Sequence, residues 1–535
     1  MRSTTVREAA FAVLREHDLL PLFANPGSTE VPLLVDLPPD LPFVLGLHEA
    51  SVVGMATGWA LGRTAVGLAI LHTTAGLGNA VGALATARAN RAPLVVLVGQ
   101  QDRRHLAHEP FLAGRLRDLA GSYPVWTTEP ARPQDVPGAL ARAAHEAQTR
   151  RGPALVIVPM DDWLAEADES REPAAPARVR RAGAIEAADV DELGQLLATA
   201  SAPALVAGAG VDDDAGWAAL VALAERLRAP VWQESFGARA GFPQDHPLFA
   251  GHLPADRRRL RAVLAAFDVV LCVGTAAFRQ YPYDDGPLAP AGVKVAVVSD
   301  DPDEVHRSAA SIALLAPPAA VCAGLAQALE QRDGDLPPRH RPPPAPQPPA
   351  DGQLLAGHVL TALGERLAPD AIVVEETPSS RPELQARILA RNPLGFVSAA
   401  MGGLGFGIPA ATGFALACPE RPVVAVVGDG SALYSIQALW SAVEYGAGAL
   451  FVVLNNGGYA VMDRLAEQQG GRGPWPQFGH LDVGAVAAGF GCSVRRVAAH
   501  AELLEVFDET VPELGARREP LLLDIAVAPD AEFLP

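Results

Sequence analysis

Residues 421–462 read RPVVAVVGDGSALYSIQALWSAVEYGAGALFVVLNNGGYAVM, and this stretch decides the fold. An apolar run at 423–427 ends in Gly428-Asp429-Gly430, and a second run at 450–454 ends in Asn455-Asn456. Such runs are typical of parallel strands that are buried on both faces. The stretch between them has apolar residues at the spacing expected for one face of a helix, namely Ile436, Leu439, Trp440 and Val443. Because strand-helix-strand crossovers are right-handed, both strands should end at the same edge of one sheet.

That edge carries chemistry suited to a metal ion and phosphate. Asp429 and Asn456 should lie side by side at the carboxyl ends of the strands, where open α/β sheets bind ligands. Their oxygens suit Mg²⁺ or, alternatively, Ca²⁺, but are too few to surround the ion unaided. Gly430 allows close approach of a phosphate, and the following helix N-terminus supplies N–H groups. We therefore predict a metal-diphosphate site here, although an acidic turn beside an ordinary Asn-Gly turn is the alternative.

The spacing of these two motifs matches a known family. Gly-Asp-Gly, 24 intervening residues and then Asn-Asn resembles the signature of the thiamine-diphosphate-dependent decarboxylases. The resemblance implies thiamine diphosphate and Mg²⁺ as cofactors. It also implies metal ligation by Asp429, Asn456 and the carbonyl of Gly458.

Composition narrows the class of protein. The chain has 535 residues, 49% of them hydrophobic, which is enough for about three conventional domains. Its net charge of -19 and its lack of basic clusters argue against nucleic acid as a partner. No apolar run is long enough for a membrane span, and residues 1–20 lack the features of a signal peptide. The cysteines are scattered among apolar neighbours, which favours free thiols in the cytoplasm: Cys272, Cys322, Cys418 and Cys492.

Alternating strand and helix patterns predict three doubly wound parallel-sheet α/β domains. We place an N-terminal domain at 1–165, a central domain at 183–334 and a C-terminal domain at 353–535. The charged, Pro/Ala-rich stretch 166–182 and the Pro-rich stretch 335–352 are predicted linkers.

The central domain contains a weak dinucleotide motif. Gly208-Ala209-Gly210 resembles the start of a nicotinamide or flavin fingerprint. However, the third glycine is missing, and the carboxylates of residues 212–214 would lie where a pyrophosphate belongs. We therefore regard an oxidoreductase as the weaker hypothesis.

Glu49 is the candidate for the other end of the coenzyme. It follows an apolar strand and opens a helix, so it should be partly buried and needs a partner. In thiamine-dependent enzymes such a glutamate hydrogen-bonds the aminopyrimidine ring and promotes loss of the thiazolium C2 proton, after which the coenzyme supplies the carbanion chemistry. The alternative is an ordinary carboxylate at a helix N-terminus.

Segments along nearly the whole chain are similar to benzoylformate decarboxylases: 25–28, Glu49, 71–76, 99–101 and 400–406. This resemblance implies that Ser28 binds the substrate carboxylate and that His72 transfers protons. It also implies a set of cofactor-binding residues, in which Leu404 supports the bent coenzyme: Glu49, Ser379, Gly402, Leu404, Gly430, Ser431 and Tyr459. Ser28 could instead cap a helix, and His72 could be a core residue.

The substrate pocket departs from the family pattern at two positions. A catalytic histidine of the family is matched by Tyr281, and a threonine is matched by Pro378. Because a phenol exchanges protons less readily than an imidazole near neutral pH, protonation after CO₂ loss would slow, and ligation to an aldehyde becomes plausible. The residues matched to the pocket are all apolar, as suits an aromatic or branched substrate: Phe111, Leu112, Val397, Val461, Met462 and Leu465.

We therefore expect decarboxylation of an aromatic 2-oxo acid to an aldehyde. The alternative within the family is a carboligase of the acetolactate-synthase or benzaldehyde-lyase type, and a catalytically silent relative is a third hypothesis. Because the coenzyme bridges two subunits in this family, the resemblance implies a homodimer or homotetramer.

Overall fold

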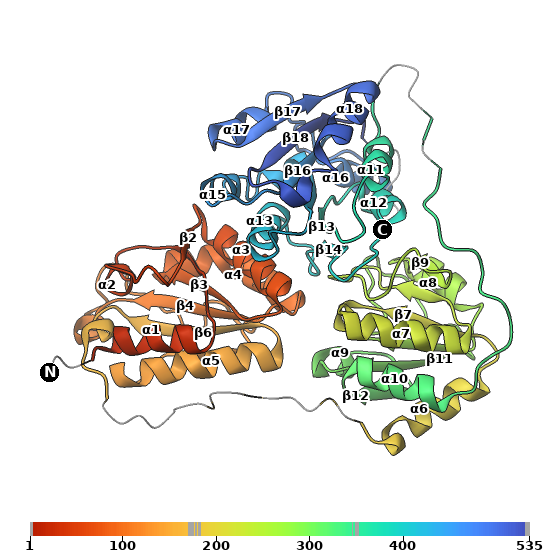
Figure 1. Cartoon of the computed structure of the whole chain (residues 1–535), viewed down its shortest axis with the longest axis horizontal. Coiled ribbons are helices and arrows are strands. Elements are labelled where there is room, and N and C mark those ends of the chain that lie inside the picture. The colour runs from red at the N-terminus through yellow and green to blue at the C-terminus, as the bar shows by residue number, and fades with distance from the viewer. Residues whose placement is uncertain are drawn as a thin grey trace.

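The computed structural model describes residues 4–168, 176, 179, 183, 185–344, 346–347 and 353–529. It forms three lobes, each built on a parallel six-stranded sheet, as expected for three α/β domains (Figure 1). Most of the predicted linker 166–182 and the residues 345 and 348–352 of the second linker lie outside the described residues.

The N-terminal sheet has the order β2-β1-β3-β4-β6-β5. Its strands are β1 (Leu22–Asn25), β2 (Phe43–Leu45), β3 (Gly67–His72), β4 (Leu94–Gln100), β5 (Trp126–Thr128) and β6 (Pro153–Pro159). Its α-helices are α1 (Val6–Glu16), α2 (Val31–Leu34), α3 (Glu49–Arg63), α4 (Thr73–Ala89) and α5 (Val136–Arg150), and its 3₁₀ turns are η1 (Arg103–His108), η2 (Pro133–Asp135) and η3 (Asp162–Leu164).

The central sheet has a different order, β12-β11-β10-β7-β8-β9, which is that of doubly wound dinucleotide-binding folds. Its strands are β7 (Pro203–Ala207), β8 (Val231–Gln233), β9 (Phe249–His252), β10 (Val269–Val273), β11 (Lys294–Ser299) and β12 (Ile312–Leu315). Its helices are α6 (Ala187–Thr199), η4 (Ala209–Val211), α7 (Asp214–Leu227), α8 (Arg257–Leu264), α9 (Pro302–His306) and α10 (Pro318–Ala328).

The C-terminal sheet, β14-β13-β15-β16-β18-β17, repeats the topology of the N-terminal sheet. Its strands are β13 (Ile372–Glu376), β14 (Val397–Ser398), β15 (Val423–Gly428), β16 (Leu450–Asn455), β17 (Ser493–Val497) and β18 (Leu521–Ala526). Its helices are α11 (Ala356–Gly364), α12 (Arg381–Arg387), α13 (Gly407–Ala417), α14 (Asp429–Ala432), α15 (Ala438–Glu444), α16 (Ala460–Gln468), α17 (Val483–Gly489), α18 (His500–Thr510) and η5 (Leu514–Ala516).

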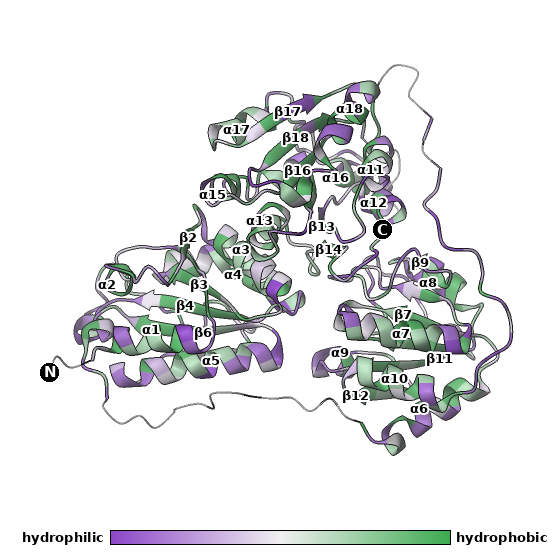
Figure 2. Ribbon diagram, in the orientation of Figure 1, coloured by the Kyte–Doolittle hydropathy of each residue, from purple (hydrophilic) through white to green (hydrophobic). Residues whose placement is uncertain are grey.

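The deciding stretch folds largely as predicted. β15 and β16 pair in parallel and are buried, and each extends one residue beyond its apolar run. Hydrophobic colour follows the strands, whereas hydrophilic colour marks the outer turns of helices such as α5 (Figure 2). The predicted helix face is only half right, since Leu439 is buried but Val443 is exposed. The helix instead packs through small residues, and the Ser441 hydroxyl donates to the Leu45 carbonyl of the N-terminal domain.

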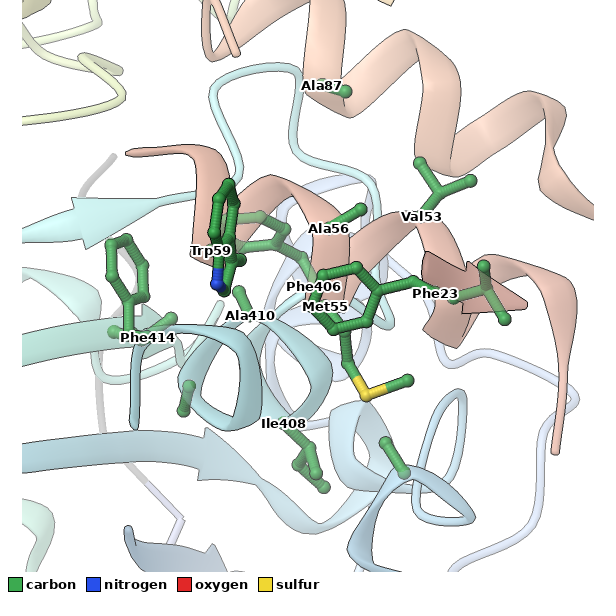
Figure 3. Close-up of a cluster of buried hydrophobic side chains, with 14 of the residues drawn as sticks. Phe23, Val53, Met55, Ala56, Trp59, Ala87, Phe406, Ile408, Ala410 and Phe414 are labelled. Carbon is green, nitrogen blue, oxygen red and sulfur yellow. The ribbon is translucent and has the colours of Figure 1, made fainter. Parts of the chain in front are cut away.

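The N-terminal and C-terminal domains are joined by close packing of α3 on α13. Glycines recur at every fourth residue of α3, at Gly54, Gly58 and Gly62. A methyl group at Gly58 would lie 2.1 Å from the Ala410 carbonyl oxygen, so the two backbones touch. Around this contact, Figure 3 shows buried side chains from both helices, among them Met55, Trp59, Ile408 and Phe414.

Among the residues that the structure describes, no helix is long and apolar enough to cross a membrane.

Candidate active site

Asp429 lies at the predicted sheet edge and is held by backbone groups alone. It follows β15 directly, and its carboxylate is buried. One oxygen accepts from the Gly430 N–H and the other from the Gly457 N–H beyond β16, each at 2.8 Å. Burial raises the pKa of Asp429, and these backbone donors oppose the rise. The Asp429 carboxylate therefore links the ends of β15 and β16 through hydrogen bonds.

The loop after β16 completes this edge. The Asn456 side-chain oxygen accepts from the Gly458 N–H at 3.2 Å, which folds the Asn456 amide back over its own turn. Tyr459 packs edge-on against Phe478, with 4.8 Å between ring centroids. A side chain at Gly430 would meet the Tyr459 ring at 2.6 Å, so only glycine fits there.

These residues fit the expected metal and diphosphate. Asp429 and Asn456 provide adjacent hard oxygens, and the glycine turns leave the backbone open to close approach. Within the described residues, no group of three or more His, Cys, Asp or Glu side chains could hold a metal ion. A diphosphate would supply further oxygens to a metal held by these two residues.

A cavity of about 1010 Å³ lies between the central and C-terminal domains. Several residues predicted to contact coenzyme or substrate line it: Tyr281, Gly402, Leu404, Val461, Met462 and Leu465. Gly402 has a φ of +74°, a conformation that favours glycine. Ser379 is not among the lining residues, but its hydroxyl accepts a hydrogen bond from the N–H of the lining residue Val461 at 3.1 Å. Ser431 is buried in α14, next to Gly430.

Val397 is placed differently from the prediction. It is fully buried in the core, whereas the next residue, Ser398, lines the cavity. Successive side chains of a strand point to opposite faces, so a shift of one residue exchanges core for cavity. Pro378 also lines the cavity, as its match to the family threonine implied.

Glu49 is buried and hydrogen-bonded, as its predicted position requires. It begins α3, 8% exposed, and its two oxygens accept from the side-chain amides of Asn25 and Asn79, each at 3.0 Å. His48 caps the helix through its ring, which accepts from the Ala50 N–H. Asn79 was not singled out from the sequence, because it lies 30 residues from Glu49 and no local pattern connects them.

His72 is held by two neighbours of Ser28. Its Nδ1 lies 2.9 Å from the Thr29 hydroxyl and 3.0 Å from the buried carboxylate of Glu30. A side chain at Gly27 would overlap the His72 ring, so the glycine permits this contact. Ser28 itself is exposed, and Glu30 rather than Ser28 occupies the N-cap position of α2. Sequence reasoning missed Glu30, whose partner is 42 residues away.

Phe111 and Leu112, predicted to face the substrate, also lie in the N-terminal domain. Phe111 is 87% exposed, and Leu112 adopts a φ of +67° in the loop after η1. Among the described residues, those lining the cavity come from the central domain, the 335–352 segment and the C-terminal domain, and none from the N-terminal domain. The predicted site residues of one chain therefore fall into two groups, one at the cavity and one in the N-terminal domain.

Tyr281 lies at the cavity and is 57% exposed. Its ring packs edge-on against Phe236 at 6.2 Å, and its backbone N–H donates to the Ala255 carbonyl. The side chain is thus accessible from the cavity.

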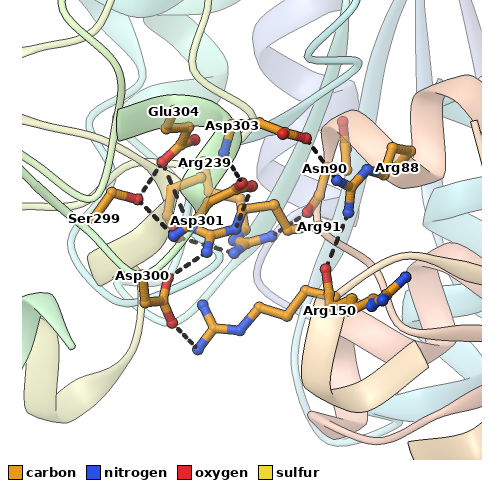
Figure 4. Close-up of polar contacts among 12 residues, drawn as sticks. Arg88, Asn90, Arg91, Arg150, Arg239, Ser299, Asp300, Asp301, Asp303 and Glu304 are labelled. Atoms are coloured by element: carbon orange, nitrogen blue, oxygen red, sulfur yellow. Dashed lines mark hydrogen bonds and ion pairs between the residues drawn. The ribbon is translucent and has the colours of Figure 1, made fainter. Parts of the chain in front are cut away.

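The central domain fills its own sheet edge with protein groups. A side chain at Gly208 would lie 2.4 Å from the Thr275 side chain, and one at Gly210 would meet the Arg91 guanidinium. Arg91, fully enclosed, bonds Asp300 and lies within 3.9 Å of Asp301, as Figure 4 shows. These contacts argue against a nicotinamide or flavin site.

Arg239 occupies the same edge and pairs with Asp212, with 3.2 Å between guanidinium and carboxylate. Burial raises the pKa of Asp212 to about 7 and lowers that of Arg239, so each charge depends on its partner.

The chain belongs to the thiamine pyrophosphate enzymes. The N-terminal TPP binding domain of that family matches residues 4–116, its central domain matches 190–325, and its C-terminal TPP binding domain matches 384–525. Thiamine diphosphate is therefore its cofactor, bound through the N-terminal and C-terminal domains.

Within this family, the chain is 38% identical to a benzoylformate decarboxylase of Pseudomonas aeruginosa over 97% of this chain and 98% of the relative. The structure of a 4-hydroxybenzoylformate decarboxylase from Rhodococcus jostii RHA1 superposes with a TM-score of 0.94 at 35% identity, covering 99% of this chain and 100% of that one. An acetolactate synthase of Arthrospira platensis is 26% identical over 98% of this chain and 95% of the relative.

Proposed function

We propose that this enzyme decarboxylates an aromatic 2-oxo acid to the corresponding aldehyde, with thiamine diphosphate and Mg²⁺, for which Ca²⁺ can substitute. The observation that carries the proposal is the position of the oxygen-rich strand edge beside a cavity with an apolar wall of Val461, Met462 and Leu465. The 38% identity to a benzoylformate decarboxylase supports decarboxylation over ligation, since the acetolactate synthase is more distant.

In this proposal the C-terminal domain binds the metal and diphosphate. Asp429, Asn456 and the Gly458 carbonyl would ligate the ion, and a larger set would contact the coenzyme: Ser379, Gly402, Leu404, Gly430, Ser431 and Tyr459. When bound, thiamine diphosphate supplies the electron sink that accepts the electrons released with CO₂. The chain holds the carboxylate of Asp429 in place before the ion arrives, because two backbone donors already fix it.

The N-terminal domain would supply the groups that act on protons. Glu49, fixed by two amides, would bind the aminopyrimidine ring of the coenzyme. Ser28 would bind the substrate carboxylate. With Nδ1 of His72 directed at Glu30, the other ring nitrogen is left to exchange a proton with the substrate. Phe111 and Leu112 would contact the substrate.

The separation of these two groups of residues supports a homodimer or a homotetramer of dimers. In either assembly the N-terminal group of one protomer would close the cavity of its partner. We place the domain boundaries at 1–165, 183–334 and 353–535, because each range contains one complete sheet. We also propose a cytoplasmic location, which the four buried free thiols support.

Product analysis tests this proposal. Purified protein loaded with thiamine diphosphate and Mg²⁺ would be incubated with aryl and alkyl 2-oxo acids, with and without an acceptor aldehyde. We expect CO₂ and the aryl aldehyde from phenylglyoxylate, and loss of turnover in Glu49→Gln. Absence of turnover with every 2-oxo acid would contradict the proposal and favour a catalytically silent role.

Carboligation is a second candidate, because the accessible Tyr281 replaces a proton-exchanging histidine of the family. If this residue limits protonation, Tyr281→His should raise the ratio of aldehyde to acyloin product. An unchanged ratio would remove the reason for preferring ligation.

A further inference from the structure

One wall of the cavity is polar, in contrast to the apolar wall beside Val461. Arg381 begins α12, three residues after Pro378, and its side chain is 16% exposed in the cavity lining. Its guanidinium donates to the Ser398 hydroxyl and lies over the Phe236 ring, 5.5 Å from the centroid. These contacts fix a long side chain that would otherwise be flexible.

Glu375 balances the charge of this arginine. Its carboxylate is buried, and one oxygen accepts from both the N–H and the hydroxyl of Thr377, at 2.7 and 3.0 Å. The other oxygen lies 3.2 Å from the Arg381 Nε, yet the Nε is buried without the geometry of a hydrogen bond. The pair is therefore neutral overall, and the Arg381 side chain, 16% exposed, lines the cavity.

His252 extends this surface without adding charge. It lines the same cavity, and burial, together with the nearby Arg381 and His340, lowers the pKa of its ring to about 3. The polar wall thus consists of Arg381, Glu375, Ser398 and His252.

We propose that the polar wall binds a hydroxyl group on the aromatic ring of the substrate and that Arg381 is the specificity-determining residue. This inference rests on the proposed function, in which the 2-oxo acid group lies at the coenzyme. The ring then extends away from the coenzyme into the cavity that the polar wall borders. A hydroxyl oxygen accepts from the guanidinium, whereas a methyl group of similar size leaves those buried donors without a partner.

The charge balance distinguishes a hydroxyl from a carboxylate. Because Glu375 already neutralises Arg381, a carboxylate placed against this wall would gain no net counter-charge from the pair. A neutral substituent that can accept a hydrogen bond is the better match.

The test compares kcat/KM for phenylglyoxylates that carry a 4-hydroxy, 4-methyl or 4-carboxy group. In the wild-type holoenzyme, we expect the 4-hydroxy compound to exceed the 4-methyl compound by about tenfold, and the 4-carboxy compound to be the slowest. Arg381→Met should lower the hydroxy-to-methyl ratio by about tenfold. Arg366→Met is the matched control, because Arg366 is similarly buried at 19% exposure, pairs with Asp508 at 2.7 Å and lies outside the cavity lining.

A wild-type ratio of one or less would overturn the inference, as would an unchanged ratio in Arg381→Met. If Arg381→Met does not fold, Ser398→Ala is tested in its place, because it removes one hydrogen bond that fixes the Arg381 guanidinium. An unchanged hydroxy-to-methyl ratio in Ser398→Ala would also overturn the inference. Turnover of unsubstituted phenylglyoxylate distinguishes failure of this inference from failure of the proposed function. If the wild-type enzyme does not turn over phenylglyoxylate, the proposed function is contradicted.

Discussion

The carboxyl edges of the C-terminal and central sheets look alike in sequence but differ in structure. Both have glycines and carboxylates directly after buried strands, at Gly428-Asp429-Gly430 and at 208–214. Among the described residues of the C-terminal domain, Asp429 is bound only by backbone N–H groups. In the central domain, Asp212 is paired with the buried Arg239, and Arg91 fills the space beside Gly210.

The difference shows what makes a strand edge available to a ligand. A carboxylate without a cationic partner keeps its charge for a metal ion, whereas a carboxylate paired with a buried arginine is already neutralised by the protein. Arg91 comes from the N-terminal domain, so the central edge is filled by an interdomain contact (Figure 4). The same pattern of residues is therefore open to a ligand in one domain and filled by protein groups in the other.

The largest expected effect is on stability at the central edge. Asp212→Asn would leave the buried Arg239 without its counter-charge and should lower the free energy of unfolding by about 3 kcal/mol. Chemical denaturation of the cofactor-free protein measures this. A loss below about 1 kcal/mol would mean that the pair is not needed to balance buried charge.

The pH dependence of stability should reveal an unpaired carboxylate near the C-terminal edge. Glu376 is fully buried and accepts from the N–H groups of Gly405, Phe406 and Gly407, and burial raises its pKa to about 7. Between an unfolded pKa of 4.5 and about 7, the folded state binds more protons, so stability should fall as pH rises through this window, by up to about 3 kcal/mol. Glu376→Gln should flatten this part of the profile, and equal slopes in both proteins would contradict the prediction.

Removing the charge of Asp429 should affect cofactor binding and leave the fold intact. Asp429→Asn keeps an oxygen acceptor but loses the anionic metal ligand, so Mg²⁺-dependent binding of thiamine diphosphate should weaken by about 100-fold. Calorimetry measures the affinity. The cofactor-free variant should stay folded with a small loss of melting temperature, because among the described residues no cation pairs with this carboxylate and only one of its two backbone N–H donors loses an acceptor. Unchanged affinity would exclude Asp429 as a ligand.

The smallest effect is expected at the rim of the central cluster. Arg88 pairs with Asp303 at 2.8 Å, but Asp303 is 70% exposed. Arg88→Ala should therefore cost less than about 1 kcal/mol. A loss as large as that of Asp212→Asn would show that burial does not control these pairs.

The sequence predicted features that depend on local patterns. The apolar runs correctly predicted β15 and β16. The right-handed crossover rule correctly predicted that the two strands are parallel and end at the same edge, so that Asp429 after β15 lies near Asn456 after β16. Glu30 and Asn79 were missed because each meets its partner only through tertiary folding. Val397 was assigned to the pocket in place of its neighbour, because resemblance alone does not determine which face of a short strand a residue takes.

The direct backbone contact between α3 and α13 limits how this chain can move. No side chain lies between Gly58 and Ala410. The N-terminal and C-terminal domains of a protomer therefore cannot slide past each other without losing this backbone contact. We therefore expect any motion that admits substrate to involve the central domain and the loops around the cavity. Substitutions that alter substrate range should accumulate in those parts, while the helix pair stays invariant.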